Sequence, residues 1–201
     1  MHLLVVAVLC GLTACRTTAI LRSGAQEDAF RKRYLGQPFY TAIVLRPYEY
    51  RKEYLIDLTG ALAEAASEPP RATLTVPLGT PITLTAIDGT HILARIDGYP
   101  GGFRLLLQAR RGTLAEVAEE LALVLAEAPP LQGARPEMRA FITRQEIAPG
   151  MSRREVYMSW GQPDKVSNSP GASGFLEEWT YFDRRMHLFL TNGFVTNWQQ
   201  Y

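Results

Sequence analysis

The chain has 201 residues, of which 47% are hydrophobic, and it carries a formal net charge of +1. This composition is typical of a folded globular protein with room for one or two domains. A nearly neutral chain gives no sign of the concentrated basic charge with which DNA- and RNA-binding proteins neutralise phosphates, so we expect no nucleic-acid partner.

The amino-terminal segment has the pattern of a secretory signal. Its apolar run, LLVVAVLCGLTAC, is too short to span a bilayer about 30 Å thick as a helix, and it ends in small residues. Leu12-Thr13-Ala14-Cys15 resembles a bacterial lipobox. The resemblance implies that residues 1–14 are a lipoprotein signal peptide and that Cys15 is lipidated, with palmitate among its acyl chains. The alternative is an ordinary cleaved signal that leaves Cys15 as a free thiol.

Cysteine usage agrees with a lipid anchor. Cys10 would leave with the signal peptide and Cys15 would carry the lipid, so no thiol would remain for a disulfide. Arg16 and not Asp follows Cys15, and by the sorting pattern of enteric lipoproteins this implies the outer membrane, facing the periplasm. Several acyl chains on one residue hold a protein firmly on a membrane. We interpret residues 15–37, which are polar and of mixed charge, as a tether with room for a short helix.

Residues 38–128 have the periodicity of strands followed by a helix. Five β-prone segments lie at 39–45, 53–58, 80–87, 90–96 and 103–108. Asp88-Gly89 favours a two-residue hairpin turn between the third and fourth segments. Short strands at this density predict a small β-barrel or a curled sheet. Between the second and third segments, residues 58–72 predict a loop with one helical turn.

A long helix is predicted from Thr113 to about Ala128. Thr113 and Glu116 have the spacing of a capping box. One helical face is apolar, and consists of Leu114, Val117, Ala118, Leu121, Val124 and Leu125. The glutamates on the remaining surface have the regularity of a solvated face, so we expect no metal site there. A proline pair ends the helix, and residues 129–137 are interpreted as a linker to a second domain, residues 138–201.

The stretch GMSRREVYMSWGQPDKV predicts a short helix with both ends specified. Ser152 is placed to cap it, and Glu155 is placed to return the bond in a capping box. Gly161 can adopt the positive φ that closes the helix, and Pro163 prevents it from resuming. So short a helix is unstable alone in water, so its apolar side must pack on the rest of the fold.

Three strands are predicted to follow, in FLEEWTYF, RMHLFLT and FVTNWQQ. Turns are expected at Asp183-Arg184 and at Asn192-Gly193. Two-residue turns at both places pair one set of side chains on one surface: Leu190 with Val195, Leu188 with Trp179 and Asn197, and Met186 with Tyr181. We predict that this surface is the core side of the sheet and that the short helix lies on it.

The opposite surface of the sheet is predicted to be unusually aromatic. Its expected members are Glu178, Thr180, Phe182, His187, Phe189, Phe194, Thr196 and Trp198. A face meant only for water would carry fewer aromatic groups. We predict that Phe189, Trp198, Phe194, His187 and Phe182 contact a partner protein. The alternatives are that the amino-terminal domain or the tether covers this face, or that its exposure is incidental.

Three carboxy-terminal motifs, IAPGMSRREVYMSWGQPDKV, EEWTY and LFLTNGFVTNW, occur in the order and spacing of a known family. The matching positions are Gly150, Met151, Ser152, Val156, Gly161, Pro163, Trp179, Tyr181, Asn192, Gly193 and Val195. Over roughly residues 138–201 the chain resembles the BamE family, also called SmpA/OmlA. The resemblance implies a two-helix, three-stranded antiparallel α+β domain, with RPEMRAFITRQEI as its first helix. It also implies an accessory lipoprotein of the machinery that inserts β-barrel proteins into the outer membrane.

The catalytic inventory favours a protein that is not an enzyme. His91 and His187 lie in predicted strands without Cys, Asp or Glu at a recognisable ligand spacing. Glu177 and Glu178 are adjacent on a strand and therefore point to opposite faces, which disqualifies them as a paired acid and base. We expect neither a cofactor nor a metal ion.

The leading hypothesis is a lipid-anchored α+β protein that supports outer-membrane protein assembly through protein contacts. One alternative is a periplasmic binding module for a cell-wall, lipid or peptide ligand, to be sought near Tyr40, Tyr48, Tyr50 and Tyr54. An inhibitor-like lipoprotein is another. A hydrolase would require polar groups that converge on His91 or His187.

Overall fold

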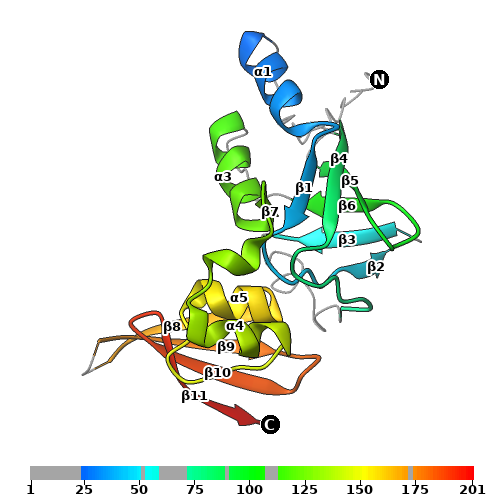
Figure 1. Ribbon diagram of the computed structural model, residues 1–201. Coiled ribbons are helices and arrows are strands. Elements are labelled where there is room, and N and C mark those ends of the chain that lie inside the picture. The colour runs from blue at the N-terminus through cyan, green and yellow to red at the C-terminus, as the bar shows by residue number, and fades with distance from the viewer. Residues whose placement is uncertain (1–23, 51–52, 59–71, 89–90, 107–112, 172–173) are drawn as a thin grey trace, which may run out of the picture.

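The fold is known from a computed structural model, which describes residues 24–50, 53–58, 72–88, 91–106, 113–171 and 174–201. The expected signal peptide, Cys15, Gly89 of the expected hairpin turn and most of the loop at 58–72 lie outside the described residues. Within these residues the chain is mixed α+β, with two sheets and four α-helices. Figure 1 shows α4 (Pro136–Thr143) and α5 (Arg153–Trp160) between the two sheets.

The amino-terminal sheet is open. Its strands are β1 (Pro38–Thr41), β2 (Tyr48–Tyr50), β3 (Glu53–Asp57), β4 (Pro81–Asp88), β5 (His91–Ile96), β6 (Phe103–Leu106) and β7 (Leu125–Ala126). They lie in the order β2-β3-β6-β5-β4-β1-β7, and β3 and β6 are the parallel pair. The barrel-like expectation is therefore corrected, because the end strands β2 and β7 do not pair with each other and the described strands form no closed barrel.

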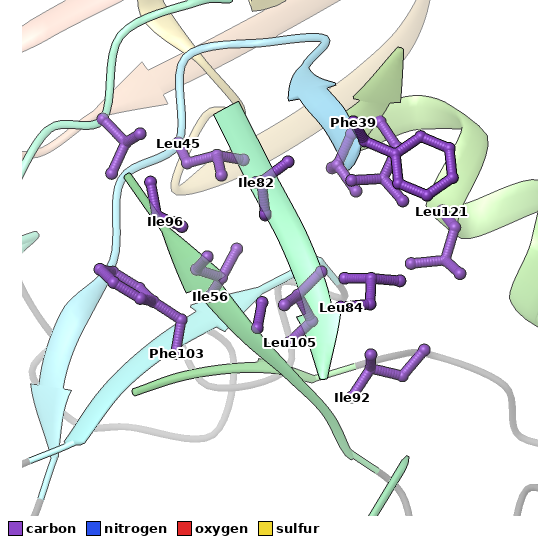
Figure 2. Close-up of a cluster of buried hydrophobic side chains, with 14 of the residues drawn as sticks. Phe39, Leu45, Ile56, Ile82, Leu84, Ile92, Ile96, Phe103, Leu105 and Leu121 are labelled. Carbon is purple, nitrogen blue, oxygen red and sulfur yellow. The ribbon is translucent and has the colours of Figure 1, made fainter. Parts of the chain in front are cut away.

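Two helices complete the amino-terminal core. α1 (Ala25–Tyr34) buries Phe30, and α3 (Leu114–Val124) buries three apolar side chains against the sheet. Figure 2 shows Leu121 of α3 with the buried side chains of the strands, among them Phe39. Residues 25–34, which the sequence placed in a tether, thus form a helix that packs on the domain.

The capping box of α3 is confirmed, but the helix ends earlier than predicted. The Thr113 Oγ1 accepts from the Glu116 N–H at 3.3 Å, as its spacing indicated. Leu125 adopts an extended conformation and pairs with Thr41 of β1. The apolar pattern continues to Leu125, so sequence periodicity alone did not distinguish the last helical turn from this short strand.

The carboxy-terminal part begins with the 3₁₀-helix η1 (Pro130–Gly133) and contains α4, α5 and a four-stranded antiparallel sheet. The strands are β8 (Lys165–Gly171), β9 (Gly174–Tyr181), β10 (Met186–Thr191) and β11 (Phe194–Gln200), in the order β11-β10-β9-β8. β8 corrects the expected three strands to four. Its sequence, KVSNSPG, lacks strand-like alternation, and its proline is tolerated because β8 is an edge strand.

The segment interpreted as a linker is part of the packed structure. Pro130 and Ala134 are buried, and Leu131 packs against the carboxy-terminal core. The guanidinium of Arg135 donates to both carboxylate oxygens of Glu155, with Nη2–Oε2 at 2.6 Å. The capping box of α5 is confirmed, and its glutamate also fixes the preceding segment.

Helix α5 is held at both ends. At its start, the Met151 carbonyl accepts from the Val195 N–H at 2.8 Å, which ties the helix entry to β11. At its end, Gly161 has φ 78°, and a Cβ at this position would clash with the carbonyl oxygen of Val44 in the amino-terminal part. The Val44 N–H donates to the Tyr157 carbonyl at 3.1 Å. α5 therefore connects the two sheets.

An arginine from the amino-terminal part strengthens the same junction. The Arg46 side chain is 7% exposed, and its Nη2 lies 3.2 Å from Asp164 Oδ2 and 2.5 Å from Asp183 Oδ1. Its guanidinium also lies over the ring of Tyr181, 5.3 Å from the centroid. Burial raises the pKa of Tyr181, whose hydroxyl donates to the Gly161 carbonyl at 3.0 Å. A neutral phenol therefore underlies the junction at physiological pH.

Candidate functional site

The candidate site is the outer face of the carboxy-terminal sheet, which is the face directed away from α4 and α5. Alternation along the strands defines it: Trp179 and Leu188 are buried under the helices, so their neighbours point outward. Across the four strands its residues are Lys165, Ser167, Ser169, Leu176, Glu178, Thr180, His187, Phe189, Thr191, Phe194, Asn197, Gln199 and Tyr201. Figure 1 shows no described helix or strand on this face.

The centre of the outer face is organised around His187. Its ring lies 6.5 Å from that of Phe189, nearly parallel to it, and 4.5 Å from that of Tyr201. The His187 Nδ1 lies 2.8 Å from Glu178 Oε1 and 3.2 Å from Thr180 Oγ1. These contacts hold the imidazole against the sheet, and they create an aromatic surface with one polar anchor.

One end of the outer face is apolar. Leu176 on β9 and Phe194 on β11 lie on either side of Thr191 on β10, and the register places all three in one row. Phe194 is 49% exposed and Leu176 is 37% exposed. An exposed apolar row next to an aromatic centre is the kind of surface that a protein partner covers.

The register corrects the predicted position of Trp198. Phe189 pairs with Asn197, but Leu190 pairs with Val195, so Thr196 is an extra residue in a β-bulge. Beyond the bulge Trp198 pairs with Leu188, and the expected pairing of Leu188 with Asn197 is wrong. The bulge therefore turns Trp198 toward the helix side of the sheet, where it stays 37% exposed at the edge strand.

The structure places three of the other predicted partner-binding residues on the outer face and one in a turn. His187, Phe189 and Phe194 lie together on the outer face, as the sequence predicted. Phe182 lies in the turn between β9 and β10, half-buried, and its N–H donates to Asp164 Oδ2 at 2.7 Å. Tyr201 was missed because no strand pattern extends to it. Leu176 was missed although its alternation with Glu178 could have placed it.

The two faces of the sheet differ in charge. On the helix side, Glu177 is 6% exposed, and its carboxylate accepts from Arg153 at 2.6 Å and from the Trp179 indole at 3.2 Å. On the outer face the charged residues are Glu178, near the centre, and Lys165, at the β8 edge. The expectation that Glu177 and Glu178 point to opposite faces is confirmed. The outer face is suited to apolar and aromatic contacts more than to a strongly charged partner.

The tyrosines proposed for a binding groove do not gather in one place. Tyr48 lies on β2 and Tyr54 on β3, whereas Tyr40 lies on β1, near the other edge of the sheet. The Tyr54 ring packs on Phe103 with centroids 5.1 Å apart. The side chain of Tyr50 lies outside the described residues.

The described residues offer neither a cluster of metal ligands nor a membrane-spanning helix. In the part of the chain that the structure describes, no cluster of three or more His, Cys, Asp or Glu side chains could hold a metal ion. None of the described helices has the length and hydropathy needed to cross a membrane. No family model, no curated protein and no solved structure matches the chain.

Proposed function

We propose that this protein is a lipid-anchored accessory protein of the bacterial envelope that binds a partner protein through the outer face and performs no catalysis. The observation that carries the proposal is the aromatic and apolar character of a sheet face on which no described element packs. Interfaces of this kind derive much of their affinity from a few aromatic anchors. Phe189 and Phe194 are the anchors we assign, with His187 between Phe189 and Tyr201.

The resemblance to the BamE family supports the proposed setting, in outer-membrane protein assembly. Its motif residues converge in space although they are distant in sequence: the segment Gly150-Met151 pairs with Val195, and the Arg153 N–H donates to the Gly193 carbonyl at 3.1 Å. Two helices on one face of an antiparallel sheet agree with the architecture that the resemblance implies. The fourth strand and the large amino-terminal sheet are additions to that pattern.

The anchor is proposed on the lipobox at Cys15. Short polar chain separates Cys15 from α1, so the folded part would stay close to the membrane. Tethering raises the local concentration of a protein near a membrane-bound partner, so a modest contact is sufficient. The proposed location is the periplasmic side of the outer membrane, and the proposed partner is a subunit of the β-barrel insertion machinery.

A crosslinking experiment tests the partner. The lipidated protein is crosslinked mildly in its own membrane and purified, and the proteins recovered with it are identified. We expect subunits of the barrel-insertion machinery, and we expect Phe194→Ala to lower their recovery. Trp198→Ala is the matched control, because Trp198 is exposed on the same strand but lies toward the other side of the sheet. Equal losses from the two variants would contradict the assignment of the outer face.

The anchor is tested separately. Cys15→Ser should move the protein from the membrane fraction to the soluble periplasmic fraction, because the acyl chains are the proposed attachment. If the amount of protein in the membrane fraction did not change, the lipid anchor would be contradicted. The proposal that the outer face binds a partner would still be tested by the crosslinking experiment.

A further inference from the structure

We infer that the junction between the two sheets contains a binding site for a single alkyl chain. A cavity of about 290 Å³ lies between the amino-terminal part, the segment before α4 and the helices α4 and α5. Its apolar lining comes from all three regions and includes Val44, Leu78, Leu131, Ile142 and Met158. The cavity is open to solvent on one side, and an apolar group that displaces water from apolar walls gains free energy, so a cavity of this size is suited to an apolar ligand.

The chemistry of the lining selects an uncharged apolar occupant. No Asp, Glu, Lys, Arg or His lines the cavity, and its polar side chains are Thr143 and Gln145. The Thr143 hydroxyl already donates to the Arg139 carbonyl at 2.9 Å. A charged group inside the cavity would lose its hydration without gaining a partner, so a headgroup would stay at the open side.

The walls of the cavity are stiff, so it does not close by a small shift of backbone. Pro129 and Pro130 have fixed φ angles. The adjoining wall at residues 77–79 is held by buried Thr41, whose hydroxyl donates to the Pro77 carbonyl at 2.7 Å and whose carbonyl accepts from the Gly79 N–H at 2.9 Å. Met158 is the adaptable member, because its unbranched side chain fits occupants of different shape.

The volume of the cavity limits the length of the alkyl chain that it can hold. An apolar cavity of about 150 Å³ holds one benzene ring, so this cavity holds roughly twice that volume, which corresponds to an alkyl chain of about ten carbons. Each methylene that enters should tighten binding about fourfold until the cavity is full. This inference is independent of the proposed partner and of the outer face.

The test uses the full chain with Cys15→Ser and with methionine methyl groups labelled for NMR. The labelled methyls include Met158 in the cavity and Met186 on the carboxy-terminal sheet. We expect 1-decanol to shift the Met158 signal saturably and to leave that of Met186 unchanged, with affinity rising about fourfold per carbon from hexanol to decanol. Absence of a saturable Met158 shift would overturn the inference.

Two filling variants make the test specific. Leu78→Phe and Leu131→Phe reduce the cavity from different walls, and each should weaken decanol binding at least tenfold. Leu123→Phe on the exposed side of α3 is the matched control and should have no effect. The signals of buried Met138 and Met151 show whether each variant is folded. Unchanged affinity in a folded filling variant would contradict the site.

Ligands with different headgroups distinguish between the possible sources of the alkyl chain. Decanoate and a decanoyl lysophospholipid have ten-carbon chains, as decanol has, with the carboxyl carbon counted, and all three should shift Met158. Tighter binding of the lysophospholipid would identify a membrane lipid as the source, and tighter binding of decanoate would identify a free fatty acid. A saturable shift with a tri-leucine amide but with none of the ten-carbon compounds would overturn the inference in favour of a peptide.

Discussion

The two faces of the carboxy-terminal sheet use similar residues for different purposes. The helix side carries glutamate, tryptophan and tyrosine, and each polar atom of Glu177 and Tyr181 has a partner in a buried setting. The outer face carries histidine, phenylalanine and tyrosine in a half-exposed cluster with no described element above it. The motif residues on which the resemblance rests therefore belong to the packing of the domain, while the surface suited to binding lies on the other side. Changes on the helix side should lower stability, and changes on the outer face should leave it nearly intact.

The largest loss of stability is expected from Gly161→Ala. The new Cβ would clash with the Val44 carbonyl oxygen, and the residue would keep a positive φ that only glycine adopts easily. We expect the free energy of unfolding to fall by roughly 2 to 4 kcal/mol, measured by denaturant titration. Gly102→Ala, at a position with open space around the Cβ, is the control and should change it little. Equal effects would show that Gly161 does not form the junction.

The next largest effect is expected at Glu155, and it depends on pH. Burial raises the pKa of this carboxyl, but hydrogen bonds from the Arg135 side chain and from the backbone and hydroxyl of Ser152 outweigh it and lower the pKa to about 2, from an ordinary value of 4.5. Because the folded-state pKa is the lower one, the stabilisation is complete above about pH 4.5 and is lost as the pH falls toward 2. Glu155→Gln should cost roughly 2 to 3 kcal/mol at neutral pH and flatten the acid limb of the stability curve.

The control for that change is Glu119→Gln, an exposed glutamate on α3. It should leave both the free energy of unfolding and its acid dependence unchanged. If Glu155→Gln loses stability at low pH as steeply as the wild-type protein does, the acid dependence comes from other carboxylates.

A smaller effect is expected from the aromatic anchors of the outer face. Phe194 is 49% exposed, so Phe194→Ala removes little buried area and should lower stability by less than about 1 kcal/mol. Thermal unfolding of the variant measures this effect, and partner recovery is measured on the same protein. A large loss of stability would show that Phe194 stabilises the fold, which would contradict the expected difference between the two faces.

The smallest effect is expected for the pair His187 and Glu178. The Glu178 side chain is 44% exposed, and polar contacts between side chains at such exposure contribute little to stability. A double-mutant cycle with His187→Gln and Glu178→Gln should give a coupling energy of at most about 0.5 kcal/mol. A coupling several times larger would mean that this pair is structural and that the outer face is more rigid than its exposure indicates.

Local rules account for the parts of the fold that the sequence predicted. The capping boxes at Thr113 and Ser152 formed, and Asn192-Gly193 makes the expected two-residue turn with φ values of 51° and 82°. Each depends on residues within a few positions of each other. The same rules placed His187, Phe189 and Phe194 on one face, because the register set by the turn survives as far as the bulge.

The features that escaped prediction depend on long-range contacts. β8 is a strand because β9 offers it a partner, although its own sequence favours a loop. No glycine in the sequence indicates the bulge at Thr196, and this one extra residue is enough to turn Trp198 from the outer face to the helix side of the sheet. Arg135 binds Glu155, twenty positions further along the sequence. The interpretation of residues 129–137 as a linker did not predict this contact.

Helix α5 also sets how the molecule unfolds. Its Tyr157 packs against both hydrophobic cores, and its ring stacks on Trp179 with centroids 4.9 Å apart. Separating the sheets would remove Tyr157 from one of the two cores and break the hydrogen bond from the Val44 N–H to the Tyr157 carbonyl. Unfolding of one half should therefore lower the stability of the other, and the two halves should unfold at more similar temperatures than they would as separate fragments.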